Sequence, residues 1–207
     1  MVIGVDLPTA GSYWKIGMIN EGRSPIVSPD PELAELIRQG VEVGNLFAVT
    51  DPSVMSLADV IVMSVHLDVA DRTVEDAEEI SVNVDAFKDA VRTVGQHMSE
   101  AALVMIETTV PIGTTRMLAL PVLEEERAKR GVSQAVKLSH AYERVMPGAN
   151  YVASIRDYWR TFSGIDERSA SATRDFLEGF INTDSFPLYQ LTEPESSEMA
   201  KLLENSY

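Results

Sequence analysis

Short apolar runs alternate with amphipathic stretches along the whole chain of 207 residues. The runs at 60–63 and 103–106 are continuously apolar, which is typical of parallel strands that helices cover on both faces. The pattern predicts strands at residues 2–6, 46–50, 59–65, 103–107, 136–140 and 187–191. It predicts helices at residues 31–39, 84–98, 115–130 with an interruption at Pro121, 167–181 and 194–205.

This alternation predicts an α/β fold with a doubly wound parallel sheet and right-handed crossovers. In such a sheet, ligands bind at the carboxyl ends of the strands. Residues 68–85 are acidic and poor in large apolar side chains. We therefore expect an exposed loop there, placed to act as a lid over the site.

Composition and charge narrow the possible partners. A hydrophobic content of 45% is enough for a core, so disorder is not expected. The formal charge of −15 would repel both nucleic acid and an anionic membrane surface. No apolar run approaches the roughly 18 residues of a membrane span, and the first residues lack the features of a signal peptide. A soluble cytoplasmic protein is expected.

Composition also narrows the chemistry. The chain contains no cysteine, so it holds no disulfide, no thiolate metal site and no cysteine nucleophile of its own. His66, His97 and His140 lack the spacing of a metal-binding pair. No metal site is predicted.

Asp6 ends the first predicted strand. In a dinucleotide-binding fold, a carboxylate at the end of the second strand accepts hydrogen bonds from the ribose hydroxyls. An aspartate after a short apolar run is also a common turn former, and no G-x-G-x-x-G turn occurs in the chain. Asp6 is therefore a candidate cofactor ligand, with a simple turn as the alternative.

Four motifs follow one another and cover nearly the whole chain. They are VIGVD at 2–6 followed by INEGRSPI at 19–26, IETTVPIGTT at 106–115, YERVMPG at 142–148, and EMAKLLENSY at 198–207. The last three are similar to E-S-T-V-P-P-G-T-T, S-P-E-R-V-x-P-G and E-x-x-K-L-x-E-N-x-Y of the UDP-glucose and GDP-mannose dehydrogenase family. One departure is that Ala141-Tyr142 replaces the family's Ser-Pro, which changes the backbone constraint before Glu143.

The resemblance implies a Rossmann-like domain that binds NAD and takes part in polysaccharide biosynthesis. Enzymes of this family oxidise the C6 alcohol of a UDP- or GDP-linked hexose to the uronic acid in two hydride transfers. A cysteine of the following domain holds the aldehyde as a thiohemiacetal, and the thioester formed from it is hydrolysed by water.

The resemblance assigns catalytic roles to Thr109 and Glu143. The Thr109 hydroxyl would orient the hydrolytic water, and Glu143 would order water or act as an acid or base near C6. Without the resemblance, Thr109 is simply the end of a strand, and Glu143 is a surface carboxylate paired with Arg144. The resemblance also places both residues beside the cofactor, together with Val65.

Lys201 and Asn205 are four residues apart, so they share one face of the predicted helix. The resemblance gives them catalytic and substrate-binding roles, in which an ammonium and a carboxamide stabilise a developing oxyanion. Glu143 and Arg144 complete the implied substrate contacts. The alternative for Lys201 is a solvated ion pair with Glu198, and a Thr192-x-x-Glu195 capping box is expected to begin the helix.

The resemblance divides the chain into a partial NAD-binding domain at 1–191 and the start of a long central dimerisation helix at 192–207. It implies a homodimer in the full-length protein, with the glycine-rich turn and the catalytic cysteine outside these residues. Without the first strand, which is central in the order 3-2-1-4-5-6, the second and fourth strands have no shared neighbour. We therefore expect this chain alone to bind NAD poorly, to be inactive and to aggregate.

An alternative stays open. The chain is then a shortened, non-catalytic relative that binds a sugar nucleotide or a full-length subunit. The Glu-Arg-Val-x-Pro-Gly form of the third motif leans towards N-acetylated or mannose-type sugars, but the sugar itself is not fixed by these residues.

Overall fold

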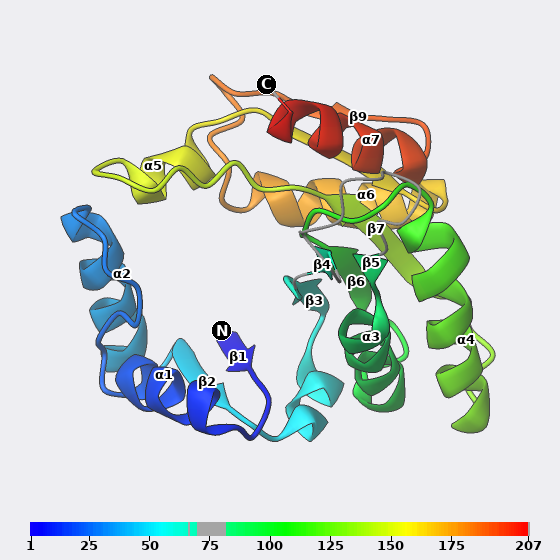
Figure 1. Ribbon diagram of the computed structural model, residues 1–207, viewed down its shortest axis with the longest axis horizontal. Coiled ribbons are helices and arrows are strands. Elements are labelled where there is room, and N and C mark those ends of the chain that lie inside the picture. Colours follow the sequence, from blue (N-terminus) through cyan, green and yellow to red (C-terminus); the bar gives the residue numbers. More distant parts are fainter. Residues whose placement is uncertain (66, 70–81, 207) are drawn as a thin grey trace. The chain divides into compact units, whose positions relative to one another are not determined.

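The computed structural model describes residues 1–65, 67–69 and 82–206, and the chain divides into two compact units (Figure 1). The first unit comprises Met1–Val54 and Arg144–Tyr158. The second unit comprises Met55–Glu143 and Trp159–Tyr207.

The first unit contains a parallel pair of strands and three helices. Strand β1 (Val2–Val5) pairs with β2 (Leu46–Val49), and both strands lie within ranges that the apolar pattern predicts. The helices are α1 (Ala10–Asn20), α2 (Pro31–Glu42) and α5 (Tyr151–Arg156). Helix α2 begins at the predicted proline, whereas α1 and α5 were not predicted.

Two sets of polar contacts organise the first unit. The Asn20 carboxamide donates to the Ala48 carbonyl at 2.9 Å and accepts from the Ala48 amide at 2.7 Å, which ties the end of α1 to β2. The Asp30 carboxylate caps α2 by accepting from the Glu32 amide at 2.9 Å. Its second oxygen accepts from the Val152 amide at 2.9 Å. Asp30 therefore joins α5 to α2.

The second unit is built on a five-stranded sheet in the order β3-β6-β7-β8-β9. Its strands are β3 (Val60–Met63), β6 (Leu103–Ile106), β7 (Lys137–Ala141), β8 (Arg160–Gly164) and β9 (Leu188–Gln190). All neighbours are parallel except β7 and β8. The predicted α/β class is confirmed, and β8, which the apolar pattern missed, adds one antiparallel pair.

Helices cover both faces of this sheet (Figure 1). On one face, α3 (Asp85–His97) and α4 (Leu120–Lys129) pack against β3, β6 and the start of β7. On the other face, α6 (Glu167–Glu178) packs against β6 and β8 through Leu177 and Phe162. This double cover is the reason for the continuously apolar strands.

The predicted helix at 115–130 is interrupted close to Pro121. A π-helix, η3 (Thr114–Ala119), runs into α4, whose first turn contains Pro121. The proline has no amide hydrogen to donate, and the first turn is the position where that loss costs least.

Helix α7 (Pro194–Asn205) packs against β7, β8 and η3. Its predicted range is confirmed, but the predicted capping box is wrong. Glu193 is the N-cap residue and makes no side-chain cap, while Glu195 pairs with Arg116 at 2.8 Å. The ion pair therefore occupies the carboxylate that the capping box would use.

The acidic segment predicted to be an exposed lid falls mostly on residues 70–81, outside the described residues. Its two ends form an antiparallel ribbon of β4 (Asp68–Val69) and β5 (Val82–Asn83), so they are not simple loop. The 3-10 helix η1 (Pro52–Leu57) contains the passage from the first unit to the second.

Strands β1 and β3 are edge strands among the described residues. Each has one edge without a described neighbour in the sheet of its own unit.

Candidate functional site

Four of the predicted site residues come together in the second unit. Thr109 follows β6 and Glu143 follows β7, so both lie at the carboxyl ends of parallel strands. The Lys201 ammonium on α7 donates to the Glu143 carbonyl at 3.0 Å. One turn later, the Asn205 carboxamide donates to the Thr109 hydroxyl at 3.1 Å. Helix α7 therefore carries a cation and an amide to the ligand-binding edge of the sheet.

Lys201 also lies over an aromatic ring. Its ammonium nitrogen is 5.3 Å from the centroid of the Tyr142 ring, within cation–π range. Tyr142 is buried and occupies the position of the proline in the family motif. The ring therefore gives Lys201 a second contact beside the Glu143 carbonyl.

Glu198 is fully buried, so the solvated Glu198–Lys201 pair considered from the sequence is wrong. Its carboxylate accepts from the Gly113 amide at 2.5 Å, the Thr115 amide at 2.8 Å and the Thr115 hydroxyl at 2.6 Å. Burial raises the pKa of Glu198, and the three donors oppose that rise. Glu198 therefore fastens α7 to the turn that opens η3.

A buried hydrogen-bond network adjoins these residues and was missed by the sequence interpretation. His140 Nδ1 lies 2.8 Å from the Ser197 hydroxyl, and His140 Nε2 lies 3.3 Å from the Thr108 carbonyl. The Ser163 and Ser197 hydroxyls are 2.6 Å apart. The signal in the sequence was the polar pair Ser139-His140 inside a predicted strand. From the sequence, His140 was considered only as a metal ligand.

A buried ion pair also lies at this edge of the sheet. Arg160, which begins β8 and is 1% exposed, donates to the Glu107 carboxylate at 2.6 Å. Burial raises the pKa of Glu107, Arg160 lowers it, and the Glu143 charge raises it. Because the charge of Glu143 affects the pKa of Glu107, the carboxylates of Glu107 and Glu143 are electrostatically coupled. The sequence interpretation did not single out either member of the pair.

The remaining predicted residues are Val65, Asp6 and Arg144. Val65, after β3, is half-buried against the core of the second unit. Asp6 follows β1 in the first unit, is exposed, and accepts from the Leu7 amide at 2.8 Å. Arg144 also belongs to the first unit, with its guanidinium carbon 4.4 Å from the Tyr158 ring centroid.

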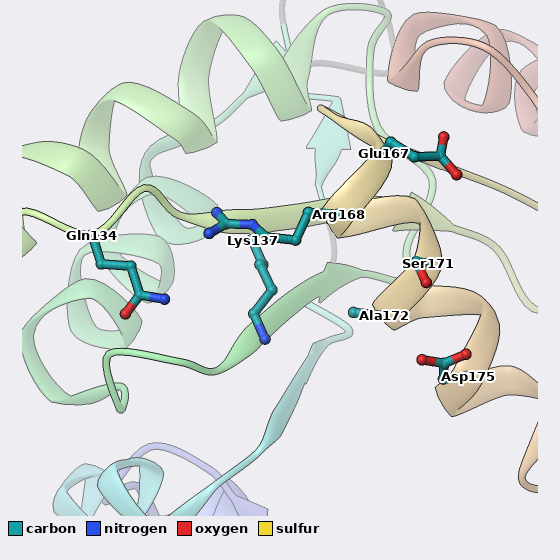
Figure 2. Close-up of a pocket in the computed structure, with 7 residues that line it drawn as sticks. All are labelled: Gln134, Lys137, Glu167, Arg168, Ser171, Ala172 and Asp175. Atoms are coloured by element: carbon teal, nitrogen blue, oxygen red, sulfur yellow. The ribbon is translucent and has the colours of Figure 1, made fainter.

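A pocket of about 450 Å³ lies on the second unit but contains none of the predicted residues. Figure 2 shows Gln134 and Lys137 on the segment that enters β7, facing side chains of α6. The α6 residues that line the pocket are Glu167, Arg168, Ser171, Ala172 and Asp175. Because Lys137 begins β7 and Glu143 follows its end, this pocket is at the opposite end of the strand from the candidate site.

The fold and the residues gathered by α7 define a nucleotide-binding domain of the doubly wound type. Residues 1–175 match the family model of the UDP-glucose/GDP-mannose dehydrogenase family, NAD binding domain. The chain belongs to this family, and NAD is the cofactor of the matched domain.

Similar proteins act on nucleotide sugars according to their names. The chain is 28% identical to the UDP-N-acetyl-D-mannosamine dehydrogenase of Pyrococcus horikoshii, over 100% of this chain and 44% of that protein. It is 32% identical to the GDP-mannose 6-dehydrogenase of Azotobacter vinelandii, over 69% of this chain and 31% of that protein. The chain thus spans less than half the length of either relative.

Solved structures agree with this assignment. An NDP-N-acetyl-D-galactosaminuronic acid dehydrogenase from Methanosarcina mazei Go1 has a TM-score of 0.85 at 28% identity, covering 99% of this chain and 41% of that one. The UDP-D-ManNAc dehydrogenase of Pyrococcus horikoshii has a TM-score of 0.80 at 25% identity, covering 99% and 44%. In the described part of the chain, no helix has the length and apolar character needed to cross a membrane.

Each unit, taken by itself, offers groups of the kind that an NAD site uses. In the first unit, Asp6 at the end of β1 is exposed and carries the acceptor oxygens that ribose hydroxyls require. In the second unit, Thr109 and Glu143 lie at the carboxyl ends of β6 and β7, where such folds bind ligands. The sequence holds no G-x-G-x-x-G turn, so the pyrophosphate contacts of the fold have no counterpart among these residues.

Proposed function

We propose that this chain is part of an NAD-dependent nucleotide-sugar 6-dehydrogenase that oxidises the C6 alcohol of a UDP- or GDP-linked hexose to the uronic acid. The observation that supports this most is the pairing of Lys201 with Glu143 and of Asn205 with Thr109. These contacts gather a cation, an amide, a backbone carbonyl and a hydroxyl at the carboxyl edge of the sheet. The reaction would proceed in two hydride transfers, with NAD supplying the hydride acceptor.

In this proposal, Lys201 and Asn205 stabilise negative charge on the oxygen bound to C6. The Lys201 ammonium already donates to a carbonyl oxygen at 3.0 Å, so its position suits donation to an alkoxide or a tetrahedral oxyanion. The Asn205 carboxamide lies one helical turn away and is exposed, with a second amide hydrogen for the same oxygen. The two groups together form an oxyanion site on one face of α7.

Thr109 and Glu143 then handle protons and water. The Thr109 hydroxyl accepts from Asn205, which leaves its own hydrogen to orient a water molecule. The Glu143 carbonyl holds Lys201, and its carboxylate is assigned as the group that orders the hydrolytic water or moves a proton at C6. Asp6, Val65, Thr109 and Glu143 are the assigned cofactor contacts.

The substrate is assigned by class only. Glu143, Arg144, Lys201 and Asn205 are the proposed substrate contacts. The names of the relatives given above refer to UDP-N-acetylmannosamine, GDP-mannose and NDP-N-acetylgalactosaminuronic acid, which supports the lean of the Glu-Arg-Val-Met-Pro-Gly motif towards N-acetylated or mannose-type sugars. We also assign residues 192–207 to the start of a central helix of the homodimer.

The test uses the whole protein that the gene encodes, of which we propose this chain to be a part. The protein is assayed with NAD and a panel of nucleotide sugars. The panel contains UDP-N-acetylmannosamine, UDP-N-acetylgalactosamine, GDP-mannose and UDP-glucose, and NADH formation is measured for each. We expect activity on at least one, and a loss of about 10²–10³-fold in kcat for Lys201→Ala, because an oxyanion donor is removed.

The matched control is Lys129→Ala, which removes an exposed lysine from α4, away from the candidate site. It should keep wild-type kcat. A wild-type protein that reduces no NAD with any member of the panel would contradict the proposal, and so would a Lys201→Ala variant as active as Lys129→Ala.

A further inference from the structure

We infer that His140, Ser197 and Ser163 form a buried clasp that positions Thr109 against Lys201 and Asn205. His140 is the central member of this clasp and acts as a positioning residue. The inference rests on the proposed function, because it assigns the clasp to the same site.

Hydrogen bonding fixes the tautomer of His140. Nε2 lies 3.3 Å from the Thr108 carbonyl, which can only accept, so Nε2 carries the hydrogen. In the neutral ring, Nδ1 is then an acceptor, and the Ser197 hydroxyl 2.8 Å away shares its one hydrogen between Nδ1 and the Pro194 carbonyl, which lies 3.0 Å away. Ser163 completes the chain by donating its hydroxyl hydrogen to Ser197 at 2.6 Å.

Burial keeps this arrangement intact. His140, Ser163 and Ser197 are each fully buried. Burial, with a smaller contribution from the positive charge of Lys201, lowers the pKa of His140 to about 4. The imidazole is therefore neutral at physiological pH, as the donor and acceptor roles above require.

Each end of the clasp lies next to a site residue. Thr108, which accepts from His140, precedes Thr109. Ser197, which donates to His140, stands one helical turn before Lys201 and two turns before Asn205. His140 itself is on β7, three residues before Glu143. The clasp thus joins the three segments that carry the candidate site.

A second set of contacts holds helix α7 in place independently of the clasp. Glu198, the neighbour of Ser197, binds Gly113 and Thr115, and Glu195 pairs with Arg116. These contacts hold α7 on η3 when the clasp is absent. Loss of the clasp is therefore expected to move the first turns of α7 relative to Thr108 without detaching the helix.

A small displacement is enough to affect the reaction. A misplacement of about 1 Å costs roughly 10²-fold in rate, because catalytic groups act only within a narrow geometry. We therefore expect His140→Leu, which removes both hydrogen bonds at similar volume, to lower kcat by about 10²-fold.

The experiment measures kcat per folded molecule in the gene product as encoded, with the nucleotide sugar that gives the highest wild-type rate. The variants are His140→Leu, His140→Gln and Ser197→Ala. Glutamine supplies one donor and one acceptor, so His140→Gln should recover at least about tenfold of the activity lost in His140→Leu. Ser169→Ala is the matched control, since Ser169 is an equally buried serine at the start of α6 that bonds to Leu138 and Asp166.

Nitrogen-15 spectra of the imidazole rings give a second readout. The His140 signals are assigned by their loss in the His140→Gln variant. We expect a neutral ring protonated at Nε2, with the Nδ1 signal shifted in Ser197→Ala and unchanged in Ser169→Ala.

The outcomes separate the inference from the proposed function. A wild-type protein inactive on every nucleotide sugar overturns the proposed function and the positioning role with it. An active wild type whose His140→Leu variant keeps full kcat per folded molecule overturns the inference alone. A ring protonated at Nδ1 also overturns it, because the assigned hydrogen bonds would then be reversed.

Discussion

The two units of the chain differ in how they exclude water. In the second unit, β3, β6, β7, α3 and α4 share a continuous apolar core in which side chains such as Phe87, Val104 and Leu123 are fully buried. In the first unit, the buried apolar side chains are Ala48 and Val152. Large apolar residues remain open to solvent there, including Val2 at 63% and Trp14 at 51% exposure.

This difference shows that the two units hold their folds by different means. Burial of apolar surface contributes about 25 cal/mol per Å², so the second unit gains most of its stability from its core. The first unit depends more on polar contacts made by Asn20 and Asp30, which contribute about 1 kcal/mol each. We therefore expect the first unit to unfold at lower denaturant concentration than the second.

The two tryptophans allow the units to be followed separately. Trp14 belongs to the first unit and Trp159 to the second. Trp159→Phe and Trp14→Phe variants each leave one reporter, and urea unfolding of both should give two midpoints, with that of Trp14 lower. Coincident midpoints would show that the units unfold together.

The largest effect is expected from truncating the core of the second unit. Phe87→Ala should lower its unfolding free energy by about 3–5 kcal/mol, because the ring is fully buried on α3. Leu36→Ala on α2 is the control in the first unit, where the side chain is 46% exposed and the loss should stay below about 1 kcal/mol. Similar losses in the two variants would contradict the comparison of cores.

The next effect is a pH dependence confined to the second unit. The pKa of His140 falls from the ordinary 6.5 to about 4 in the folded state, because the ring is buried. The unfolded chain therefore binds a proton first, so the contribution of His140 to stability is complete above pH 6.5 and is lost as pH falls towards 4. The full loss is on the order of 3 kcal/mol.

Urea unfolding of the wild type and of His140→Gln between pH 7 and pH 4 checks this. The wild type should lose stability over that range faster than the variant. Glu107 and Glu198 have raised pKa values and act in the opposite direction, but they are present in both proteins. If the unfolding free energy of the two proteins falls equally with pH, the lowered pKa assigned to His140 is contradicted.

A smaller effect is expected where β8 meets α6. A methyl group added to Gly164 would lie 2.3 Å from the Ala170 amide nitrogen, so Gly164→Ala should destabilise the second unit by about 1–3 kcal/mol. Gly17 on α1 has open space around it, and Gly17→Ala should stabilise the first unit by about 0.5–1 kcal/mol. Opposite signs in thermal unfolding support the packing described, and equal signs argue against it.

The smallest effect concerns the polar contacts of the first unit. Asn20→Ala removes two hydrogen bonds to Ala48 and should cost about 1–2 kcal/mol, measured through Trp14 fluorescence. The side chain of Asn45, which precedes β2, makes no hydrogen bond to that strand, and Asn45→Ala serves as the control. An Asn20→Ala variant as stable as this control would contradict the claim that the hydrogen bonds of Asn20 stabilise the first unit.

Much of the fold was predictable from the sequence because parallel strands covered on both faces are continuously apolar. This holds for β3 and β6, and the helix starting at Pro31 was predicted from its proline. Strand β8 was not predicted, because Arg160 and Ser163 interrupt its apolar pattern to make buried contacts. Helix α1 was missed because its apolar residues follow no helical period and two glycines lie within it.

The candidate site shows the same division. Thr109, Glu143, Lys201 and Asn205 were found because their motifs resemble those of a known family, and the structure brings them together. The roles of Glu198 and His140 were not predictable from spacing. Their partners lie 83 and 57 residues away in the chain, and only the packing of α7 on η3 and β7 brings them into contact.

The most direct test of the central claim is the yield of NADH per molecule of nucleotide sugar oxidised by the gene product. With the sugar limiting and NAD in excess, we predict two molecules of NADH for each nucleotide sugar and a uronic acid as the product. A yield of one NADH with an aldehyde or ketone as the product, or no NADH at all, would contradict the assignment of Thr109, Glu143, Lys201 and Asn205 to a nucleotide-sugar 6-dehydrogenase.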